Sequence, residues 1–363
     1  MKLLHFADLH LDAPFAWARP EVARRRRANR RQTLTRIIEL AEEEHADLLL
    51  CAGDLFEHER FTPDTVAFLR ESFARTDLPI YLAPGNHDWY SARSPYALTE
   101  WSPNVHVFSE PRLTPIELAD GLTLWGAAHR APANTGDFFT GFRADRGGVH
   151  LAVAHASERS ALPFQESGKE PHAPFDAGEL EEAGIAHAFL GHYHVARDRE
   201  RYTYPGNPDP LEFGESEGRG AVLASVAADG TLTRERRSVN ISQVHDLPIA
   251  LEGCHHLDDV LQRIAIAIAP LSGSVRVTLS GEVSADLPID PRTLAHLGDH
   301  LDGFVVRIGA IVPSYDLEAI HAELTVRGQF ARDTLEIPDE ERRRKVLITG
   351  LRALEGRSDL EVA

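Results

Sequence analysis

Short apolar runs alternate with longer amphipathic segments along the first part of the chain. Three apolar runs predict buried strands, at residues 2–7, 47–53 and 79–85. The segments between them have the apolar spacing of helices, at residues 21–44 and 62–74. Strands that alternate with helices in this way are parallel and joined by crossover helices, so the pattern predicts an α/β fold.

The pattern continues to about residue 240 and then restarts. Before that point, strands are predicted at 105–109, 122–128, 149–156 and 186–192, followed by a hairpin over 221–239. Beyond it, strands are predicted at 244–251, 274–283 and 304–315, and helices at 256–269, 290–301 and 338–356. We therefore expect an α/β domain over residues 1–240, a small α+β capping domain over 241–325, and a C-terminal tail with a partner-binding helix over 326–363.

The composition is that of a soluble globular protein. The chain has 363 residues, of which 43% are hydrophobic and 26% charged, so it is long enough for two domains and a large core. It contains no run of 18 apolar residues, and its first residues, MKLLHFADLH, are too polar for a signal peptide. We therefore expect a cytoplasmic protein without a membrane partner.

The charge is negative overall but uneven along the chain. The formal net charge of −18 argues against a protein that coats nucleic acid by bulk attraction. Between Arg19 and Arg36, however, there are eight arginines and only one acid. Three members of this cluster are weak candidates for contacts with a phosphate backbone: Arg24, Arg27 and Arg31. The alternative is a solvated helix face, because consecutive arginines cannot all lie on one side of a helix.

Polar side chains follow five of the predicted strands, at the point where each strand ends. They are Asp8, His10, Asp54, Asn86, His155, His192 and His194. Because ligands of an open α/β sheet bind beyond the carboxyl ends of its strands, we expect these groups to meet at one edge. Carboxylate, amide and imidazole donors suit manganese, iron or zinc, and the oxygen content favours manganese. Seven donors are too many for one catalytic ion, so the set predicts two divalent ions that share a carboxylate.

Three glycines, Gly53, Gly85 and Gly191, each precede one of these turns. We expect them to permit a positive φ and a close approach of the backbone to the metals. The alternative for the whole set is a group of buried, hydrogen-bonded histidines and helix-capping aspartates.

The blocks ADLH, AGDLFE, PGNHD, VAHA and GHYH resemble, in this order, those of the calcineurin-like metallophosphoesterase superfamily. YPGNPDPLEFGE at residues 204–215 looks like the segment that follows GHxH in the SbcD-type DNA repair exonucleases, the bacterial counterparts of the meiotic recombination nuclease. VRGQFARDTLE at 326–336 looks like the tail of a shorter subgroup. The resemblance implies a four-layer α-β-β-α sandwich of two mixed sheets. It also implies exonuclease or endonuclease activity on DNA in double-strand-break repair.

Carried over block by block, the resemblance assigns a role to each candidate. It implies one metal on Asp8, His10 and His194, a second on Asn86, His155 and His192, and Asp54 as the bridge. It also implies that a hydroxide between the metals attacks the phosphodiester. His87 would then assist the leaving group, oriented by Asp88. One position departs from the family: Glu57 stands where a histidine often follows GDLF, and His58 comes next. An acid there is expected to weaken phosphate contact.

The resemblance also implies DNA, an SbcC-type SMC-like ATPase subunit and a second copy of the chain as partners. The predicted C-terminal helix carries an apolar stripe for such an ATPase, or for packing in cis: Leu347, Ile348, Leu351 and Leu354. Two other functions stay open. One is hydrolysis of small phosphoesters or cyclic nucleotides, which the acidic charge and Glu57 favour. The other is a non-catalytic assembly subunit, against which the intact ligand set counts.

Overall fold

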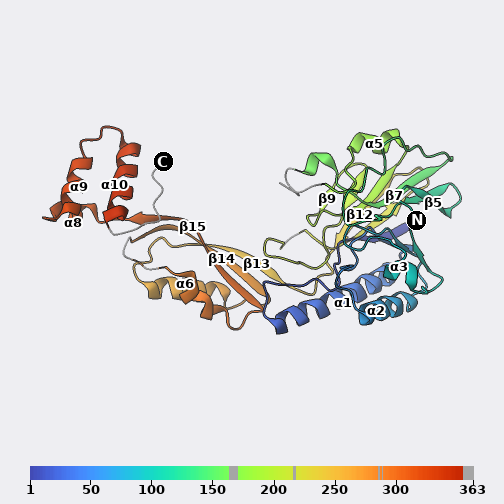
Figure 1. Ribbon diagram of the computed structural model, residues 1–363, viewed down its shortest axis with the longest axis horizontal. Coiled ribbons are helices and arrows are strands. Elements are labelled where there is room, and N and C mark those ends of the chain that lie inside the picture. Colours follow the sequence, from blue (N-terminus) through green and yellow to red (C-terminus); the bar gives the residue numbers. More distant parts are fainter. Residues whose placement is uncertain (163–170, 216–217, 285–286, 288, 355–363) are drawn as a thin grey trace. The chain divides into compact units, whose positions relative to one another are not determined.

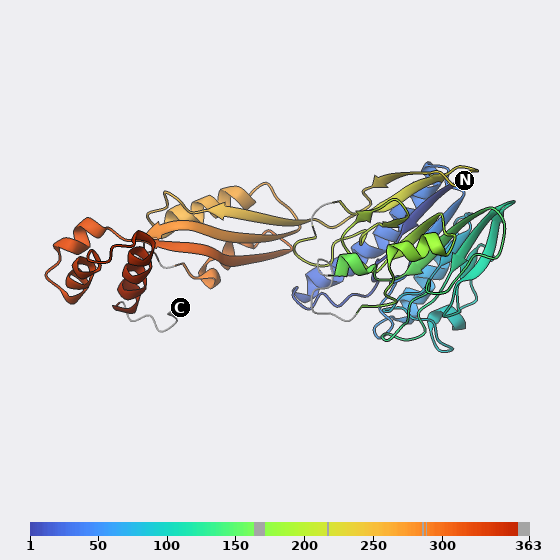
Figure 2. The same cartoon turned by 90° about the horizontal axis from the view of Figure 1, so that it is seen from above.

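The computed structural model describes residues 1–162, 171–215, 218–284, 287 and 289–354. It divides the chain into two compact units, Met1–His245 and Asp246–Ala363. Figure 1 and Figure 2 show the first unit as the part with α1, α2 and both larger sheets, and the second as the part that contains β14 and β15. None of the helices in the described part of the chain has the length and apolarity that a membrane span requires.

The first sheet of unit 1 contains six strands in the order β12-β11-β1-β2-β3-β4. Four of them are parallel: β1 (Lys2–Phe6), β2 (Leu48–Cys51), β3 (Ile80–Leu82) and β4 (Val105–Val107). The hairpin of β11 (Ala221–Val226) and β12 (Leu232–Arg237) adds two antiparallel strands beside β1. The helices α1 (Pro20–Glu43) and α2 (Pro63–Ala74) connect the parallel strands, as the alternating pattern predicts.

The second sheet has the order β5-β6-β7-β8-β10-β9. Its centre is parallel and consists of β6 (Leu122–Gly126), β7 (Val149–His155), β8 (His187–Gly191) and β10 (Tyr202–Tyr204). The edge strands β5 (Thr114–Ala119) and β9 (Arg197–Asp198) are antiparallel to their neighbours. Among the described residues of the unit there are also three short helical segments: α3 (Pro95–Leu98), a 3₁₀ turn (Arg159–Ala161) and α5 (Ala177–Glu182).

Strand periodicity explains how the sheets stack. In β1, Leu4 and Phe6 pack in the cluster shared with α1 and α2, whereas Leu3 packs with residues of the second sheet. This alternation places one apolar core between helices and sheet, and another between the two sheets. A third cluster, around Phe175 and Leu180, lies against α5 on the far side of the second sheet. The predicted α/β sandwich of two mixed sheets is therefore confirmed.

Several short elements differ from the predictions. The strands β5, β9 and β10 and the helices α3 and α5 are not among the predicted elements. The strands β9 and β10 and the helix α3 have two to four residues, too few for a clear pattern, whereas β5 contains a proline and no residue of it is fully buried. The helix predicted over 290–301 is instead α7 (Pro291–Leu294), followed by a 3₁₀ turn at Ala295–Gly298. At Gly298 a Cβ would collide with the side chain of Phe304, so this turn lies too close to β15 for a regular helix to continue.

Unit 2 combines a small sheet with helices. Its strands have the order β13-β14-β15, with β13 (Val244–Ala250) beginning just before the unit, then β14 (Ser274–Ser284) and β15 (Gly303–Ser314). The sheet and α6 (Leu257–Ile268) share one apolar cluster. Three further helices follow: α8 (Leu317–Ala322), α9 (Val326–Thr334) and α10 (Glu340–Leu354). The last two residues of the helix predicted over 338–356 lie outside the described residues.

Half of the predicted apolar stripe packs within unit 2. Leu347 and Leu351 of α10 are buried against Ile320 of α8 and Ala331 of α9. Leu354 is 48% exposed. The alternative of packing in cis therefore holds for the two buried leucines, while the end of the stripe faces solvent.

Candidate metal centre

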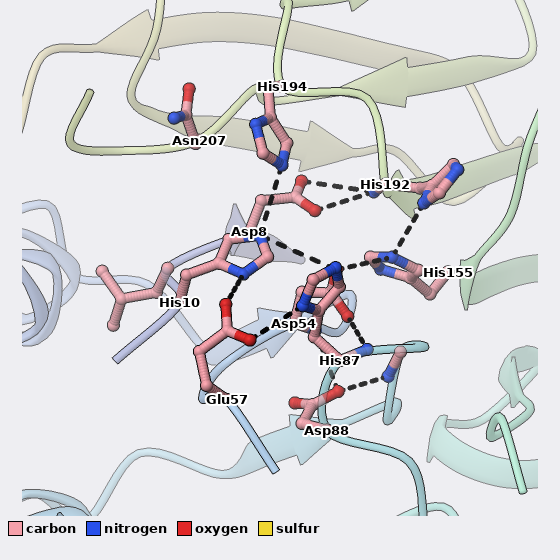
Figure 3. A network of polar contacts seen from close by, with 12 residues as sticks. Asp8, His10, Asp54, Glu57, His87, Asp88, His155, His192, His194 and Asn207 are labelled. Carbon is pink, nitrogen blue, oxygen red and sulfur yellow. Dashed lines mark hydrogen bonds and ion pairs between the residues drawn. The ribbon is translucent and has the colours of Figure 1, made fainter. Parts of the chain in front are cut away.

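Both sheets of unit 1 contribute to one cluster of polar side chains, which Figure 3 shows from close by. The first sheet supplies the residues that follow β1, β2 and β3: Asp8, His10, Asp54 and Asn86. The second sheet supplies the end of β7 and the turn after β8: His155, His192 and His194. The cluster therefore lies where the carboxyl ends of two stacked sheets meet, and not at the edge of a single sheet.

The backbone of this cluster is held in an uncommon conformation. Asp8, His10, Asp54 and His192 have φ values of 56°, 47°, 53° and 109°. Such left-handed conformations cost a residue with a side chain about 1–3 kcal/mol each. Backbone bonds between the loops maintain them, because the amide of His10 donates to Asp54 O at 2.9 Å and that of Asp8 to Gly53 O at 3.0 Å. These strained turns therefore lower the stability of the fold, and in exchange they fix the directions of the four side chains.

The three predicted glycines are required for different reasons. Gly53 has a φ of 89°, as predicted, and a Cβ there would lie 2.6 Å from His155 Nδ1, so the backbone also approaches a predicted ligand closely. Gly85 has no positive φ, but a Cβ there would collide with the side chain of Asp54 and lie 2.8 Å from His155 Cγ. Gly191 likewise lacks a positive φ and would collide with Ala52 O. For these two the expectation of a positive φ is wrong, and only the close approach remains.

The side chains form two histidine pairs with an aspartate between them. Nε2 of His10 faces Nε2 of His194 at 3.2 Å, and Nδ1 of His192 faces Nε2 of His155 at 3.2 Å. Asp54 Oδ2 lies 3.2 Å from His155 Nε2 and 3.7 Å from His10 Nε2. Two ring nitrogens can face each other at this distance only when a proton or a cation lies between them.

The donor set fits divalent cations. Three overlapping groups have ligand atoms within 4.8 Å of one another: Asp8, His10 and His194; Asp8, Asp54 and His155; and His10, Asp54 and His87. In the described part of the chain, the buried Oδ1 of Asn86 has no hydrogen-bond partner. A buried amide oxygen without a donor is costly, and a metal ion is one group that satisfies it. Nitrogen and oxygen donors without sulfur suit manganese, iron or zinc.

Burial and mutual charge shift the ionisation of these groups. Burial raises the pKa of Asp8 to about 6 and lowers the pKa of His10 to about 4. Burial also opposes ionisation of Asp54 and His155, but their attraction outweighs it. The pKa of His155 is therefore raised to about 9, and that of Asp54 is held well below its usual value. The site thus stabilises positive charge beside a buried carboxylate, the environment that a bound cation requires.

His87 lies at the open side of this cluster, with its side chain 45% exposed. Its Nδ1 is 2.9 Å from Glu57 Oε2, while Glu57 Oε1 is 2.8 Å from His10 Nδ1. Burial opposes the positive charge of His87, but the negative charges of Asp54 and Glu57 outweigh this effect and raise the pKa of His87 to about 10. The two histidines lower the pKa of Glu57 to about 2. Glu57, which stands where the resembling family often has a histidine, is therefore hydrogen-bonded to two imidazoles. Its carboxylate is not free to repel a phosphate.

Asp88 has a different role from the one predicted. Its buried carboxylate accepts the amides of Asp54 at 3.0 Å, Leu55 at 2.7 Å and Gly85 at 2.6 Å, and the hydroxyl of Tyr96 at 2.6 Å. Within the described residues no hydrogen bond joins it to the His87 ring. The expectation that Asp88 orients His87 is therefore wrong. Asp88 instead holds together the loops that follow β2 and β3.

A second carboxylate holds His194, and the sequence analysis missed it. Glu215 Oε1 lies 3.3 Å from His194 Nδ1, and Glu215 Oε2 accepts Asn207 Nδ2 at 2.6 Å and the amide of Leu211 at 2.6 Å. Asn207, Leu211 and Glu215 all belong to the YPGNPDPLEFGE segment. That segment was therefore a signal for this contact, which orients the ring of a predicted ligand.

The arginine cluster of α1 divides into buried and exposed members. Arg26 donates to Pro210 O, and Arg30 donates to Leu9 O and, at 2.9 Å, to Asp209 O. The three arginines that were predicted to contact phosphate take no part in these buried hydrogen bonds. Arg24 is exposed, Arg27 donates to Pro14 O at 3.4 Å, and Arg31 is paired with Asp64 at 2.6 Å.

A cavity of about 510 Å³ opens beside the cluster. Its described lining includes five of the seven predicted ligands, all but Asp8 and His155, together with Glu57, His87, His172, Leu211 and Glu212, but none of the three candidate arginines. The cavity is large enough for a phosphoester and its flanking groups. The polar groups in the described lining are therefore mostly imidazoles and carboxylates, and His87 is an exposed cationic group among them.

Comparisons with known proteins show what this chain is similar to. The sequence model of the calcineurin-like phosphoesterase family matches residues 1–196. The chain is 27% identical over 243 residues to an uncharacterized metallophosphoesterase of Bacillus subtilis, YhaO, covering 62% of this chain and 57% of that protein. It is 26% identical over 260 residues to the DNA double-strand break repair protein Mre11 of Aeropyrum pernix, covering 61% and 57%. The chain thus spans little more than half the length of either relative.

Among solved structures, TT1561 of Thermus thermophilus is similar with a TM-score of 0.38 at 13% identity, over 65% of this chain and 98% of that one.

Proposed function

The chain belongs to the calcineurin-like phosphoesterase family, and we propose that it hydrolyses the phosphodiester backbone of DNA with two bound manganese ions. The observation that carries this proposal is the convergence of seven oxygen and nitrogen donors from two sheets beside an open cavity. The distant similarity to an archaeal double-strand-break repair protein supports DNA as the substrate and repair as the context.

The residues fall into two sets that would each hold a cation. Asp8, His10 and His194 would hold one ion and Asn86, His155 and His192 the other, while Asp54 lies between the two histidine pairs and would contact both. When bound, such ions lower the pKa of a water molecule and offset the negative charge of a phosphate. The chain's own contribution is to fix the donors before any cation binds, through the strained turns and the carboxylates behind them.

His87 would act on the leaving group. Its ring faces the cavity, and its Nδ1 is held by Glu57, so Nε2 is the nitrogen available to substrate. As the bond between phosphorus and the leaving sugar oxygen breaks, His87 Nε2 donates its proton to that oxygen. The oxygen of a water forms the new bond to phosphorus, and the water's proton passes to solvent. The products are a phosphate monoester and a free sugar hydroxyl.

Two observations bear on how the DNA is held. Arg24 is the exposed member of the three candidate arginines, so we retain it as a proposed contact with a backbone phosphate. Glu57 had favoured small phosphoesters or cyclic nucleotides as substrates, but its carboxylate is hydrogen-bonded to two histidines, of which His87 carries a balancing positive charge. The negative net charge of the chain is therefore the remaining support for hydrolysis of small phosphoesters or cyclic nucleotides.

The helices of unit 2 are our proposed partner surface. Around the buried cluster of α8, α9 and α10, several apolar side chains stay exposed, most of all Leu324 at 98%, Val326 at 75% and Leu335 at 55%. Large exposed apolar side chains that lie together are typical of a surface that binds another protein. We propose that it binds the coiled coil of an SMC-like ATPase, and that the nuclease acts as a homodimer in that complex.

The test is manganese-dependent degradation of end-labelled linear DNA, compared with hydrolysis of bis(4-nitrophenyl) phosphate, with and without a co-purified ATPase. Hydrolysis of DNA supports the proposal, whereas hydrolysis of the small diester alone favours the second function. The variant His87→Ala should keep both ions and lose about 10²–10⁴-fold in turnover on DNA. Full turnover in a His87→Ala protein that retains both metals would refute the role of His87.

A further inference from the structure

Glu57 lies between the two loops that carry His10 and His87. Its amide donates to Leu11 O at 3.0 Å, and the next amide, of His58, donates to His87 O at 2.8 Å. Phe56 and Leu11 also form an isolated parallel bridge. The backbone at Glu57 is therefore tied to both loops before its side chain makes any contact, and the side chain is only 18% exposed.

Each carboxylate oxygen of Glu57 holds a different imidazole. Oε1 lies 2.8 Å from His10 Nδ1, and Oε2 lies 2.9 Å from His87 Nδ1 (Figure 3). The two rings stand almost perpendicular, at 83°, with their centroids 4.8 Å apart. One side chain thus determines the orientation of two rings that would otherwise turn independently about χ2.

The nitrogens that remain face different groups. Nε2 of His10 points at the buried cluster, 3.2 Å from His194 Nε2, while the His87 ring lines the cavity. When a carboxylate accepts the Nδ1–H of a histidine, it fixes the tautomer and leaves Nε2 for the ligand. Glu57 does this at once for a predicted metal ligand and for the predicted proton donor.

We propose that Glu57 is a positioning residue that aligns His87 with the metal centre by holding the rings of His10 and His87 on one carboxylate. The proposal rests on the function proposed above and assigns to this chain a device where the resembling family often has a histidine. A histidine at this position has one acceptor nitrogen at most, so it cannot accept from two neighbouring rings. Only Glu or Asp offers two acceptor oxygens, and only Glu has the reach seen here.

Three substitutions separate reach from charge. Glu57→Gln keeps the length but offers one acceptor oxygen, so one ring loses its partner. Glu57→Asp keeps the charge but is one methylene shorter, so it cannot contact both rings. The control is Glu59→Gln, which removes an equal charge from an exposed residue nearby. Each protein is assayed with manganese on DNA, whose leaving group is a sugar hydroxyl, and on bis(4-nitrophenyl) phosphate, whose leaving group needs little protonation.

We expect Glu57→Gln and Glu57→Asp to lower kcat on DNA by about 10–100-fold, and by clearly less on the nitrophenyl diester, with KM nearly unchanged. The dissociation constant of Mn²⁺, measured by calorimetry, should rise about tenfold or more through His10. In the His87→Ala protein, adding Glu57→Gln should not change the ratio of kcat on DNA to kcat on the nitrophenyl diester any further. A wild-type kcat for Glu57→Asp, or equal losses on both substrates, would overturn the proposal.

Two measurements keep the proposal testable if the function is wrong. A wild-type protein that hydrolyses neither diester would refute the proposed function. The Mn²⁺ dissociation constant and the ¹⁵N resonances of the His87 ring still report on Glu57. A Mn²⁺ affinity and a His87 Nδ1–H signal that are both unchanged in Glu57→Gln would show that Glu57 positions neither ring. Loss of the signal with folding intact, by circular dichroism, supports the role.

Discussion

Replacing the buried Arg30 with methionine tests how the fold supports the site. Arg30 is fully buried in α1, and its guanidinium donates to Leu9 O and to Asp209 O. Leu9 stands between the predicted ligands Asp8 and His10. The change therefore removes the donor that fixes this loop while nearly conserving side-chain volume.

The expected cost follows from the two carbonyl groups left behind. A buried polar group that loses its partner costs about 1–3 kcal/mol, and two such groups are affected. Replacing Arg30 also removes the desolvation penalty of a buried charge, which offsets part of this loss. That penalty is the reason why the pKa of Arg30 is lowered to about 10. We expect a net loss of about 3 kcal/mol in the free energy of unfolding of unit 1.

Guanidinium chloride denaturation followed by tryptophan fluorescence measures this loss. All four tryptophans lie in unit 1, so the signal reports on that unit and not on unit 2. The matched control is Arg24→Met, an exposed position of the same helix, which should change stability by less than about 0.5 kcal/mol. A change below about 0.5 kcal/mol for Arg30→Met as well would refute the view that this guanidinium supports the loop.

Three further predictions concern the site and its surroundings. Asp54→Ala should abolish activity and leave less than one ion bound per chain, because Asp54 lies between both histidine pairs; retention of two ions by elemental analysis would contradict this. Gly85→Ala should weaken Mn²⁺ binding while unit 1 still unfolds cooperatively, because the new Cβ would displace Asp54; calorimetry measures it, and unchanged affinity would be evidence against this packing. Burial lowers the pKa of His187 to about 3, so protonation favours the unfolded chain and stability is lost as pH falls below about 6.5. From pH 7.5 to 5 the wild type should therefore lose about 2 kcal/mol more than His187→Gln in denaturation experiments, and parallel losses would show that His187 does not titrate in this range.

The ligand positions could be predicted because each follows a strand with a strong apolar pattern. Asp8 follows β1 and His155 ends β7, and the rule that parallel strands present their carboxyl ends to a ligand places both at the site. The sequence pattern does not tell which strands share a sheet, so it predicted one edge where the structure has two sheets that meet.

The roles of Glu57 and Asp88 could not be separated in the same way. Both are acids close to a ligand block, and either could have oriented His87. The outcome depends on how two loops lie beside each other, which follows from the bond between Glu57 N and Leu11 O and from the amides that surround Asp88. These are contacts between distant segments, and neither propensity nor periodicity reports them.

The three-residue strand β10 was missed for a related reason. It consists of Tyr202–Tyr204, and its first two residues pair with Ala188 and Phe189 of β8. A run this short has no measurable period, so its strand conformation is set by the neighbouring strand rather than by its own sequence. The YPGNPDPLEFGE segment overlaps the end of β10, so this pairing also positions the residues that lead to Glu215.

The division of the ligand set between two sheets has a consequence for how the protein matures. A chain that has formed only its first sheet has Asp8, His10, Asp54 and Asn86, and lacks every histidine that the second sheet supplies. Since a ligand stabilises only the state that binds it, divalent cations would favour the docking of the two sheets over the formation of either sheet alone. Metal supply would then influence the yield of correctly assembled molecules as well as the rate of the finished enzyme.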